Sequence, residues 1–257
     1  MLGVLGLLGL AIVVTVLTVV VPRLTSSDPE VDPVAQDAQP PVLLVPGYGG
    51  GTDSLQPLAA ALRRAGRDVT IVELAGDGTG DLNVQAGVLQ DAVRRVAGPS
   101  GSVDLVGYSA GGVTVRLWMR EYDGGSVARR IVTLGSPHHG TDLASLATDL
   151  APDECPEACR QLANDSDLLR SLDDGDETPP GPSWVSIWTD DDEVSTPPDT
   201  AQLDGALDVE VQGVCPRHHV THGQLPADPV VMAMVLDQLQ RTPVRTPPAS
   251  VCGQDAA

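Results

Sequence analysis

The 257-residue chain contains no phenylalanine and no lysine, and aromatic residues make up only 2% of it. All 15 basic residues are therefore arginine, and they stand against 35 acidic residues, which gives a formal net charge of −20. So large an excess of acid argues against a protein that neutralises nucleic-acid phosphates or docks on anionic lipid through a basic patch. We therefore expect no nucleic-acid partner.

The common motifs for phosphate and metal binding are also missing. The glycine-rich run Gly47–Gly51 lacks the Lys-Ser/Thr pair of a P-loop. His218 and His222 have the spacing of a metal-binding pair, but no HExxH glutamate accompanies them and they fall in a predicted loop. The sequence therefore predicts no metal and no cofactor, in a chain whose 42% apolar residues suffice for one globular core.

The first 22 residues are the longest uncharged stretch near the N-terminus. Leu2–Val21 is a 20-residue apolar run, and a helix of that length spans a bilayer core of roughly 30 Å. A signal peptide is the alternative, but the run exceeds a usual h-region, has no basic n-region and shows no clear A-x-A cleavage site. We predict an uncleaved membrane anchor at 1–22, a flexible polar linker at 23–41, and export of the remainder across the membrane.

Cysteine usage agrees with an exported protein. The four cysteines are an even number and allow three pairings. Cys155 and Cys159 can close a small loop, which leaves Cys215 to hold the Pro-rich tail, residues 243–257, through Cys252. Free buried thiols are the alternative, and two disulfides are the prediction.

Apolar periodicity predicts alternating strands and helices through residues 42–242. Such alternation indicates a mostly parallel sheet with helices on both faces. The stretch Thr141–Pro182 is less regular, and we expect it near the mouth of a site. Strands are predicted at Pro41–Pro46, Val69–Leu74, Ser102–Val106, Arg130–Leu134, Trp184–Trp188 and Leu207–Val211, and helices at Ser54–Ala65, Leu82–Ala97, Ala110–Tyr122 and Pro229–Gln240.

The segment GYSAG, Gly107–Gly111, fits the G-x-S-x-G pattern directly after a predicted strand and before a predicted helix. In that context the turn holds Ser109 in a strained conformation that lifts its hydroxyl above the sheet. The positive end of the following helix favours a developing oxyanion. The alternative is a strand-to-helix turn without a catalytic role. The occurrence of the motif in the context that it requires makes this alternative less favoured.

A serine hydroxyl needs a base and an acid, and in this architecture they follow in the order Ser, Asp/Glu, His. His222 lies in a loop before the closing helix and is the candidate base, with His218 and His219 as rivals. The candidate acid lies among four carboxylates, 190–193, that follow the predicted strand Trp184–Trp188. The residues alone do not choose among the four.

Five blocks in this order resemble secreted bacterial lipases and esterases of the α/β-hydrolase class, of the small triacylglycerol-lipase, class 2 type. The likeness covers roughly 42–239. In place of the His-Gly often found in the first block, this chain has Pro46-Gly47, which puts the shape of an acyl pocket in question. The blocks are VLLVPGYGG from Val42, GYSAGG from Gly107, LGSPHHGT from Leu134, SIWTDDDEV from Ser186 and HGQLP from His222.

The resemblance implies an α/β-hydrolase fold and assigns roles residue by residue. Ser109 would be the nucleophile, His222 the general base and Asp192 the acid. The backbone N–H groups of Tyr48 and Ala110 would form the oxyanion hole. The pair His138-His139 matches a block near the rim of the sheet, and we expect it to be structural.

The predicted activity is hydrolysis of an acyl ester or lipid through an acyl-enzyme on Ser109. The low aromatic content favours short or medium acyl chains. An acyltransferase that passes the same acyl group to a cell-envelope acceptor is the first alternative. A membrane-anchored binding protein without activity is the second, because fold does not fix function.

Overall fold

A computed structural model describes residues 31–98 and 101–253. Its centre is one six-stranded sheet in the order β2-β1-β3-β4-β5-β6, in which every neighbouring pair of strands is parallel. The predicted α/β-hydrolase fold class is confirmed. The strands are β1 (Val42–Val45), β2 (Val69–Ile71), β3 (Val103–Tyr108), β4 (Ala128–Leu134), β5 (Ser183–Trp188) and β6 (Leu207–Glu210).

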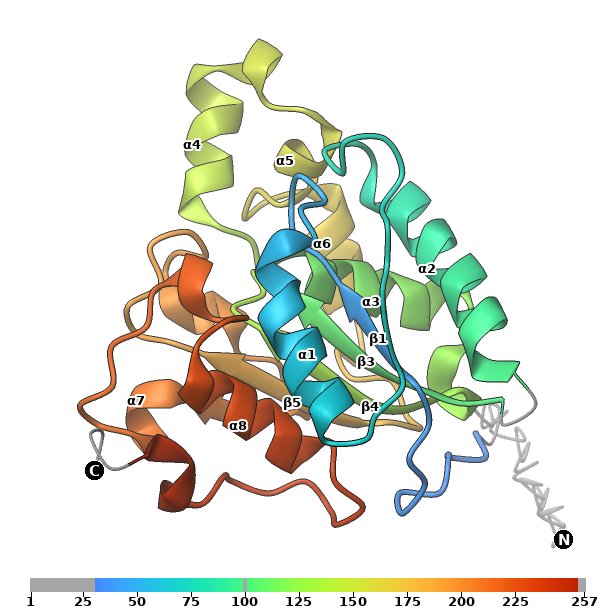
Figure 1. Cartoon of the computed structure of the whole chain (residues 1–257). Helices are drawn as coiled ribbons and strands as arrows, with labels where there is room; N and C mark the ends of the chain where they lie inside the picture. The colour runs from blue at the N-terminus through green and yellow to red at the C-terminus, as the bar shows by residue number, and fades with distance from the viewer. Residues whose placement is uncertain (1–30, 99–100, 254–257) are drawn as a thin grey trace, which may run out of the picture. The chain divides into compact units, whose positions relative to one another are not determined.

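The central strands are apolar without alternation because both faces of the sheet are covered. In β1, Val42 and Leu44 enter one hydrophobic cluster while Leu43 and Val45 enter the other, and all four side chains are fully buried. Helices α1 (Gln56–Arg64) and α8 (Pro229–Gln238) supply the first cluster, and α2 (Leu82–Ala97) and α3 (Ala110–Glu121) supply the second (Figure 1).

Local sequence signals fix where these helices begin. The Asp81 side chain caps α2 by accepting a hydrogen bond from the backbone N–H of Asn83. The Asp228 carboxylate caps α8 in the same way, and Pro229 occupies the first helical position, where no N–H is needed.

The stretch 141–182 contains more regular structure than the sequence indicated. Its three helices are short, and two of them begin at side-chain caps, Thr141 for α4 and Ser166 for α6. The apolar repeats in these helices are too short for periodicity to reveal. The additional helices are α4 (Asp142–Leu150), α5 (Glu157–Gln161), α6 (Asp167–Asp173) and α7 (Val211–Val214), with 3₁₀ turns at Asp53–Leu55, Gly124–Ser126, Pro152–Glu154, Pro198–Ala201, His222–Gln224 and Ala249–Cys252.

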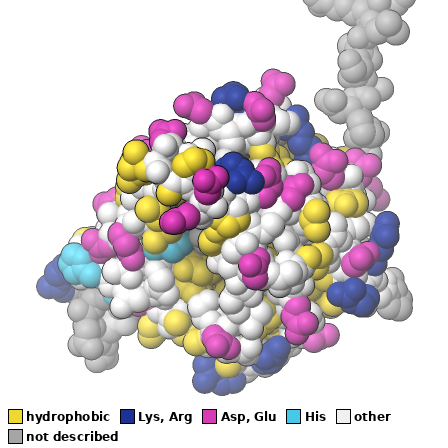
Figure 2. Space-filling model, turned by 90° about the horizontal axis from the view of Figure 1, so that it is seen from above, with side chains coloured by type: hydrophobic (Ala, Val, Ile, Leu, Met, Phe, Trp, Pro, Cys, Tyr) yellow, Lys and Arg dark blue, Asp and Glu magenta, His cyan; other side chains and the backbone are white. Residues whose placement is uncertain are grey.

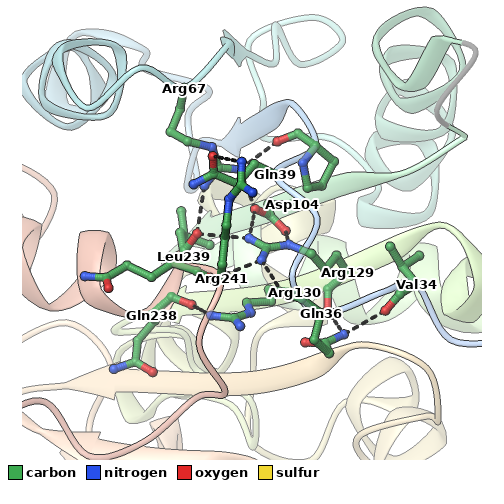
Figure 3. A network of polar contacts seen from close by, with 12 residues as sticks. Val34, Gln36, Gln39, Arg67, Asp104, Arg129, Arg130, Gln238, Leu239 and Arg241 are labelled. Atoms are coloured by element: carbon green, nitrogen blue, oxygen red, sulfur yellow. Dashed lines mark hydrogen bonds and ion pairs between the residues drawn. The ribbon is translucent and has the colours of Figure 1, made fainter.

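A buried ionic cluster lies at the end of the sheet where β3 and β4 begin (Figure 3). The fully buried Asp104 carboxylate accepts hydrogen bonds from Arg67 at 2.6 Å and from Arg129 at 2.5 Å and 2.8 Å. The two arginines also donate to the backbone carbonyl of Leu239, and Arg130 donates to that of Gln238. The arginines thus saturate carbonyls at the C-terminal end of α8, where cations are favoured.

The described end of the predicted linker, residues 31–41, makes defined contacts with the domain. The Gln36 side chain donates to the backbone carbonyl of Arg129 at 3.2 Å, and the backbone carbonyl of Gln36 accepts from the Arg129 guanidinium at 2.9 Å. Pro40 is buried, and its carbonyl accepts from Arg67 at 2.6 Å. This part of the chain is therefore a strap across the ionic cluster rather than a free tether.

Both disulfides anticipated from the cysteine count are formed. Cys155 bonds to Cys159, and Cys215 bonds to Cys252, so the second bridge ties the C-terminal tail to the end of α7. The predicted anchor at 1–22 lies outside the described residues. Within the described residues, no helix combines the length and apolar character that crossing a bilayer requires.

Candidate active site

Ser109 sits on a sharp turn between the end of β3 and the start of α3. Its backbone has φ 53° and ψ −127°, a conformation that is costly for a residue with a Cβ. The flanking glycines are required by close packing: a Cβ on Gly107 would lie 2.6 Å from the Gly112 Cα, and one on Gly111 would lie 2.3 Å from the Val45 carbonyl oxygen. The strained elbow expected from the motif is present.

Three buried side chains form one hydrogen-bonded chain. The Ser109 Oγ lies 3.0 Å from His222 Nε2, and His222 Nδ1 lies 2.8 Å from Asp192 Oδ2. Ser109, His222 and Asp192 are only 9%, 5% and 6% exposed, respectively. The structure thus brings together the three residues that the resemblance selected, in the geometry of a nucleophile, a base and an orienting acid.

The Asp192 carboxylate is held by the backbone of its own loop. The other carboxylate oxygen of Asp192 accepts hydrogen bonds from the N–H groups of Val194 at 2.9 Å and Ser195 at 2.7 Å. The Ser195 hydroxyl donates in turn to the carbonyl of Gly135, which follows β4. These bonds fix one oxygen of Asp192 and leave the other directed at His222.

The imidazole is positioned through its backbone. The His222 N–H donates to the Glu193 carboxylate at 3.1 Å, and its carbonyl accepts from the Tyr108 hydroxyl at 3.2 Å. Burial, followed by the charges of Asp192 and Glu193, raises the pKa of Tyr108 to about 12. Tyr108 therefore keeps its proton at neutral pH and can donate to the His222 carbonyl.

The rival histidines are engaged elsewhere. His218 Nε2 lies 2.9 Å from the Asp228 carboxylate, at the cap of α8. His219 Nδ1 lies 2.9 Å from Asp191, and its side chain is 83% exposed. Neither histidine is hydrogen-bonded to Ser109 within the described structure.

The four carboxylates that competed for the role of the acid are separated by burial. Asp190 is exposed, and Asp191 pairs with His219. Glu193 contacts the backbone of His222 rather than its ring. Only Asp192 of this group is both buried and hydrogen-bonded to the imidazole.

Gly135 is part of the site although the sequence analysis gave it no role. Its φ is +54°, and a Cβ there would lie 2.6 Å from Leu225 Cδ1, 3.0 Å from Asp192 Oδ2 and 3.2 Å from His222 Nδ1. A glycine directly after a buried strand can be expected to adopt a positive φ. The sequence does not show, however, which side chains from distant segments pack against this glycine. Gly135 therefore makes room for the contact between Asp192 and His222.

We predict that Gly135→Ala lowers kcat by about 100-fold, because the added methyl group displaces the Asp192–His222 pair. The left-handed backbone adds a stability cost of roughly 1–2 kcal/mol. Gly66→Ala is the matched control, since Gly66 has φ +82° with no atom within 4 Å of a Cβ. Measurement of kcat and of thermal unfolding for both variants separates the effect of backbone strain from that of displacing the Asp192–His222 pair. Equal kcat values in the two variants would contradict the role of Gly135.

The loop after β1 runs directly against the serine. A Cβ on Gly47 would lie 2.9 Å from the Ser109 Cβ, so only glycine allows this approach. Tyr48 comes next, and both Tyr48 and Ser109 line one pocket. Ala110 is the first residue of α3, where backbone N–H groups have no partner within the helix. The two segments expected to supply oxyanion donors therefore both border Ser109.

A pocket of about 180 Å³ opens beside Ser109. A larger groove of about 620 Å³ lies among α2, α3, α5 and α6, but its lining is mostly charged or polar and does not include Ser109. The walls of the smaller pocket are mainly apolar. Its lining residues are Tyr48, Ser109, Pro137, Thr141, Leu143, Ala144, Ala147, Cys159, Leu162, Val194 and Ser195.

The His138-His139 pair contacts the scaffold rather than Ser109. His138 is fully buried with Nε2 3.0 Å from the Thr133 hydroxyl, and burial, aided by Arg116, holds its pKa well below the ordinary value. His139, Asp173 and Glu177 place potential metal-ligand atoms within 4.8 Å of one another. His139 already contacts Glu177 at 3.1 Å, and Arg116 contacts Asp173 at 3.0 Å.

Solved lipase structures share this fold at low sequence identity. Lipase B of Aspergillus fumigatus superposes with a TM-score of 0.70 at 21% identity over 84% of this chain, which spans only 56% of that lipase. The mature form of the Bacillus licheniformis lipase BlEst2 gives 0.65 at 19% identity over 79% of this chain and 93% of its own. A structure from the work on the metagenome-derived lipolytic enzymes LipS and LipT gives 0.60 at 16% identity, over 79% and 94%.

Comparison with the curated proteins gives no match. A family model described as the alpha/beta hydrolase fold matches residues 40–174, which is more than half of the chain. The matched region runs from β1 through the turn at Ser109 to α6. The chain therefore belongs to the α/β-hydrolase fold family.

Proposed function

We propose that this protein is a serine hydrolase of carboxylic esters, a lipase or esterase. The observation that carries the proposal is the continuous chain from Ser109 Oγ through His222 to Asp192, at 3.0 Å and 2.8 Å, beside an apolar pocket. Such a chain activates a hydroxyl that is otherwise a weak nucleophile. The lipases and esterases among the structural neighbours agree with this chemistry.

The mechanism follows from the positions of the groups. His222 Nε2 takes the Ser109 proton as the oxygen attacks the ester carbonyl, and the N–H groups of Ala110 and Tyr48 stabilise the resulting oxyanion. His222, oriented by Asp192, then protonates the leaving alcohol. Water enters, loses a proton to His222 and attacks the acyl-enzyme, which releases the carboxylic acid and restores Ser109.

The test combines covalent labelling with turnover. We expect a fluorophosphonate probe to label Ser109 alone, as read by peptide mass spectrometry. We also expect the protein that has not been treated with the probe to hydrolyse a series of nitrophenyl esters. Labelling without hydrolysis, followed by product formation only with an added alcohol, would indicate an acyltransferase. The absence of labelling in folded protein would contradict the proposal and favour a binding role.

We further propose that the apolar pocket holds the acyl chain and limits it to short or medium length. The α4 side of the pocket is formed partly by the small residues Ala144 and Ala147. Ala147→Trp should therefore fill the pocket and lower kcat/KM for a dissolved octanoyl ester by about tenfold or more, with little effect on an acetyl ester.

Leu150→Trp is the control for this change, because Leu150 lies on the same helix, is 76% exposed and does not line the pocket. Steady-state kinetics on acetyl, butyryl and octanoyl nitrophenyl esters below their solubility limits measure the effect. An Ala147→Trp variant with an unchanged chain-length profile would place the acyl chain elsewhere.

We also propose that the catalytic domain works outside the cytoplasm. Two disulfides support this location, because such bonds persist mainly in oxidising compartments. A secreted or membrane-anchored bacterial enzyme of the class 2 lipase type would meet this condition.

A further inference from the structure

Two glycine-rich loops touch at the end of the sheet where Ser109 lies. Residues 47–51, here called the oxyanion loop, follow β1, and residues 75–81, here called the brace loop, lead into α2. In Figure 1 the oxyanion loop (blue) and the brace loop (teal) lie side by side near α5, and the Gly49 N–H donates to the Gly78 carbonyl at 3.3 Å. The brace loop thus supports the segment that is expected to supply one oxyanion donor.

Gly78 packs against the oxyanion loop with no room for a side chain. It is buried, its φ is +73°, and a Cβ there would lie 2.4 Å from the Gly50 nitrogen and 2.7 Å from the Gly50 Cα. The next nearest atom is the Gly49 carbonyl carbon, at 2.9 Å. All three are backbone atoms, which cannot rotate away as the end of a flexible side chain can. A side chain at position 78 would therefore displace the backbone of the oxyanion loop.

The position of the oxyanion loop sets the direction of the Tyr48 N–H. This N–H belongs to the same planar, trans peptide group as the Gly47 carbonyl, so the two point in opposite directions. The Gly47 carbonyl accepts a hydrogen bond from the Gly50 N–H at 3.1 Å, which directs the Tyr48 N–H away from Gly50. Because Gly78 packs against Gly50, displacement of Gly50 would reorient the peptide group that carries the Tyr48 N–H.

The brace loop is itself held by α2 and α5. The Gln85 side chain is 1% exposed and bonds both backbone groups of Ala75, at 2.8 Å and 3.2 Å. The Ala75 carbonyl also accepts from the Gly78 N–H at 3.2 Å, and the N–H of fully buried Ala158 in α5 donates to the Thr79 carbonyl at 3.0 Å. Because the loop is bonded to a helix on each side of Gly78, the position of Gly78 is fixed.

We propose that Gly78 is a positioning residue for the oxyanion hole. It holds the oxyanion loop where the Tyr48 N–H stabilises the negative charge that develops on the substrate oxygen. The inference rests on the proposed ester hydrolase function and adds a residue on which that function depends. Gly78 does not line the pocket beside Ser109, so it acts through the backbone of residues 47–51. Preorganised donors stabilise the transition state more than the bound ester, so kcat should respond and KM should not.

The test compares alanine substitutions at two glycines of the brace loop in the full chain. Gly78→Ala should lower kcat for dissolved nitrophenyl butyrate by about 100-fold, the lower end of the loss seen when an oxyanion donor is removed, with KM within about twofold of the wild type. Gly76→Ala is the matched control, because Gly76 has φ +63° and no atom within 4 Å of a Cβ. It introduces similar backbone strain and should keep kcat within about twofold.

The variants leave the charge of the molecule unchanged. Figure 2 looks onto the end of the molecule where the two loops lie and shows acidic side chains spread over it. A charge change there would alter the electrostatic field at the candidate active site and obscure an effect of geometry. Substitution of glycine by alanine, or of glutamine by methionine, avoids this.

Binding of a butyl trifluoromethyl ketone gives a readout that does not depend on turnover. The Ser109 oxygen adds to the ketone carbon and its proton passes to His222, so that the ketone oxygen becomes an oxyanion held as in the transition state. In Gly78→Ala the inhibition constant Ki should rise by about the factor by which kcat/KM falls, and in Gly76→Ala it should stay within about twofold.

Gln85→Met acts on the same loop without placing an atom against the oxyanion loop. Loss of both hydrogen bonds to Ala75 should release the brace loop, lower kcat about tenfold and raise Ki for the ketone about tenfold, with KM again unchanged. Thermal unfolding of every variant shows whether it is folded at the assay temperature. This variant decides the outcome if Gly78→Ala is not obtained folded.

Equal kcat and Ki values in Gly78→Ala and Gly76→Ala would overturn the proposal, as would a rise in KM with kcat unchanged. In the absence of folded Gly78→Ala, wild-type kcat and Ki in Gln85→Met would overturn it. A folded wild type that neither hydrolyses the ester nor binds the ketone would refute the ester hydrolase and the role of Gly78 together. Hydrolysis by the wild type with no difference between the two alanine variants would refute the role of Gly78 alone.

Discussion

Replacement of Ser109 by alanine is expected to lower kcat for ester hydrolysis by about 10⁴-fold or more, which is the scale seen when a nucleophile of this kind is removed. The Ser109 hydroxyl is the group that His222 Nε2 contacts, so no other described side chain takes its place. The fold should persist, because alanine retains the Cβ and loses one hydrogen bond worth about 1 kcal/mol. Steady-state kinetics and thermal unfolding of the purified variant measure the two effects.

Asp192→Asn should approach the same loss, because the amide no longer supports the imidazole in the tautomer that accepts the Ser109 proton. Asp191→Asn is its matched control: Asp191 is the adjacent residue and contacts the exposed His219. We expect its kcat to stay within about twofold of the wild type, as for a surface substitution. Full activity of Ser109→Ala, or equal losses in the two aspartate variants, would remove Ser109 or Asp192 from the proposed mechanism.

The regular elements around the sheet were predictable because their signals are local. The helical repeat of Leu82–Ala97 matches α2 residue for residue, and β1 lies within the apolar run Pro41–Pro46. The tight packing of Gly107 and Gly111 also follows from the motif, since the elbow requires close backbone approach. In these segments, local propensity and tertiary packing favour the same conformation.

The choice of acid was not available from the residues alone. Asp190, Asp191, Asp192 and Glu193 are chemically similar neighbours, and the resemblance singled out Asp192. In the structure, Asp192 is held in place by hydrogen bonds from the backbone N–H groups of Val194 and Ser195. These hydrogen bonds form only when the loop folds. The run of four acidic residues does not by itself predict the conformation of that loop.

Gly135 and α4 were missed for a different reason. Gly135 matters because Leu225, Asp192 and His222 converge on it from segments distant in sequence. Helix α4 has only nine residues, which is too short a stretch for its apolar repeat to identify a helix, and only one of its side chains is buried. Both features depend on which loops meet at one end of the sheet, and that is a property of the whole fold.

Asp104→Asn is expected to lower the free energy of unfolding by roughly 3–5 kcal/mol, the largest stability effect among these predictions. Asp104 is fully buried and is paired with Arg67 and Arg129, which are themselves 8% and 0% exposed. Loss of its charge leaves these guanidinium groups buried beside Arg130 with no carboxylate partner. Urea denaturation of the full chain, followed by circular dichroism, measures the change.

Asp68→Asn is the control, because Asp68 is exposed and adjacent to Arg67 in sequence, and the expected change in the free energy of unfolding is within about 0.5 kcal/mol.

Measurement of kcat tests whether the ionic cluster affects the candidate active site. Asp104 is the second residue of β3 and Ser109 directly follows its last, so Ser109 is five positions further along an extended chain, a span of about 16 Å. Well below its unfolding temperature, Asp104→Asn should therefore keep the wild-type kcat. A large fall in kcat without a loss of stability would mean that the ionic cluster acts on the serine elbow through β3, and not on the strength of the fold.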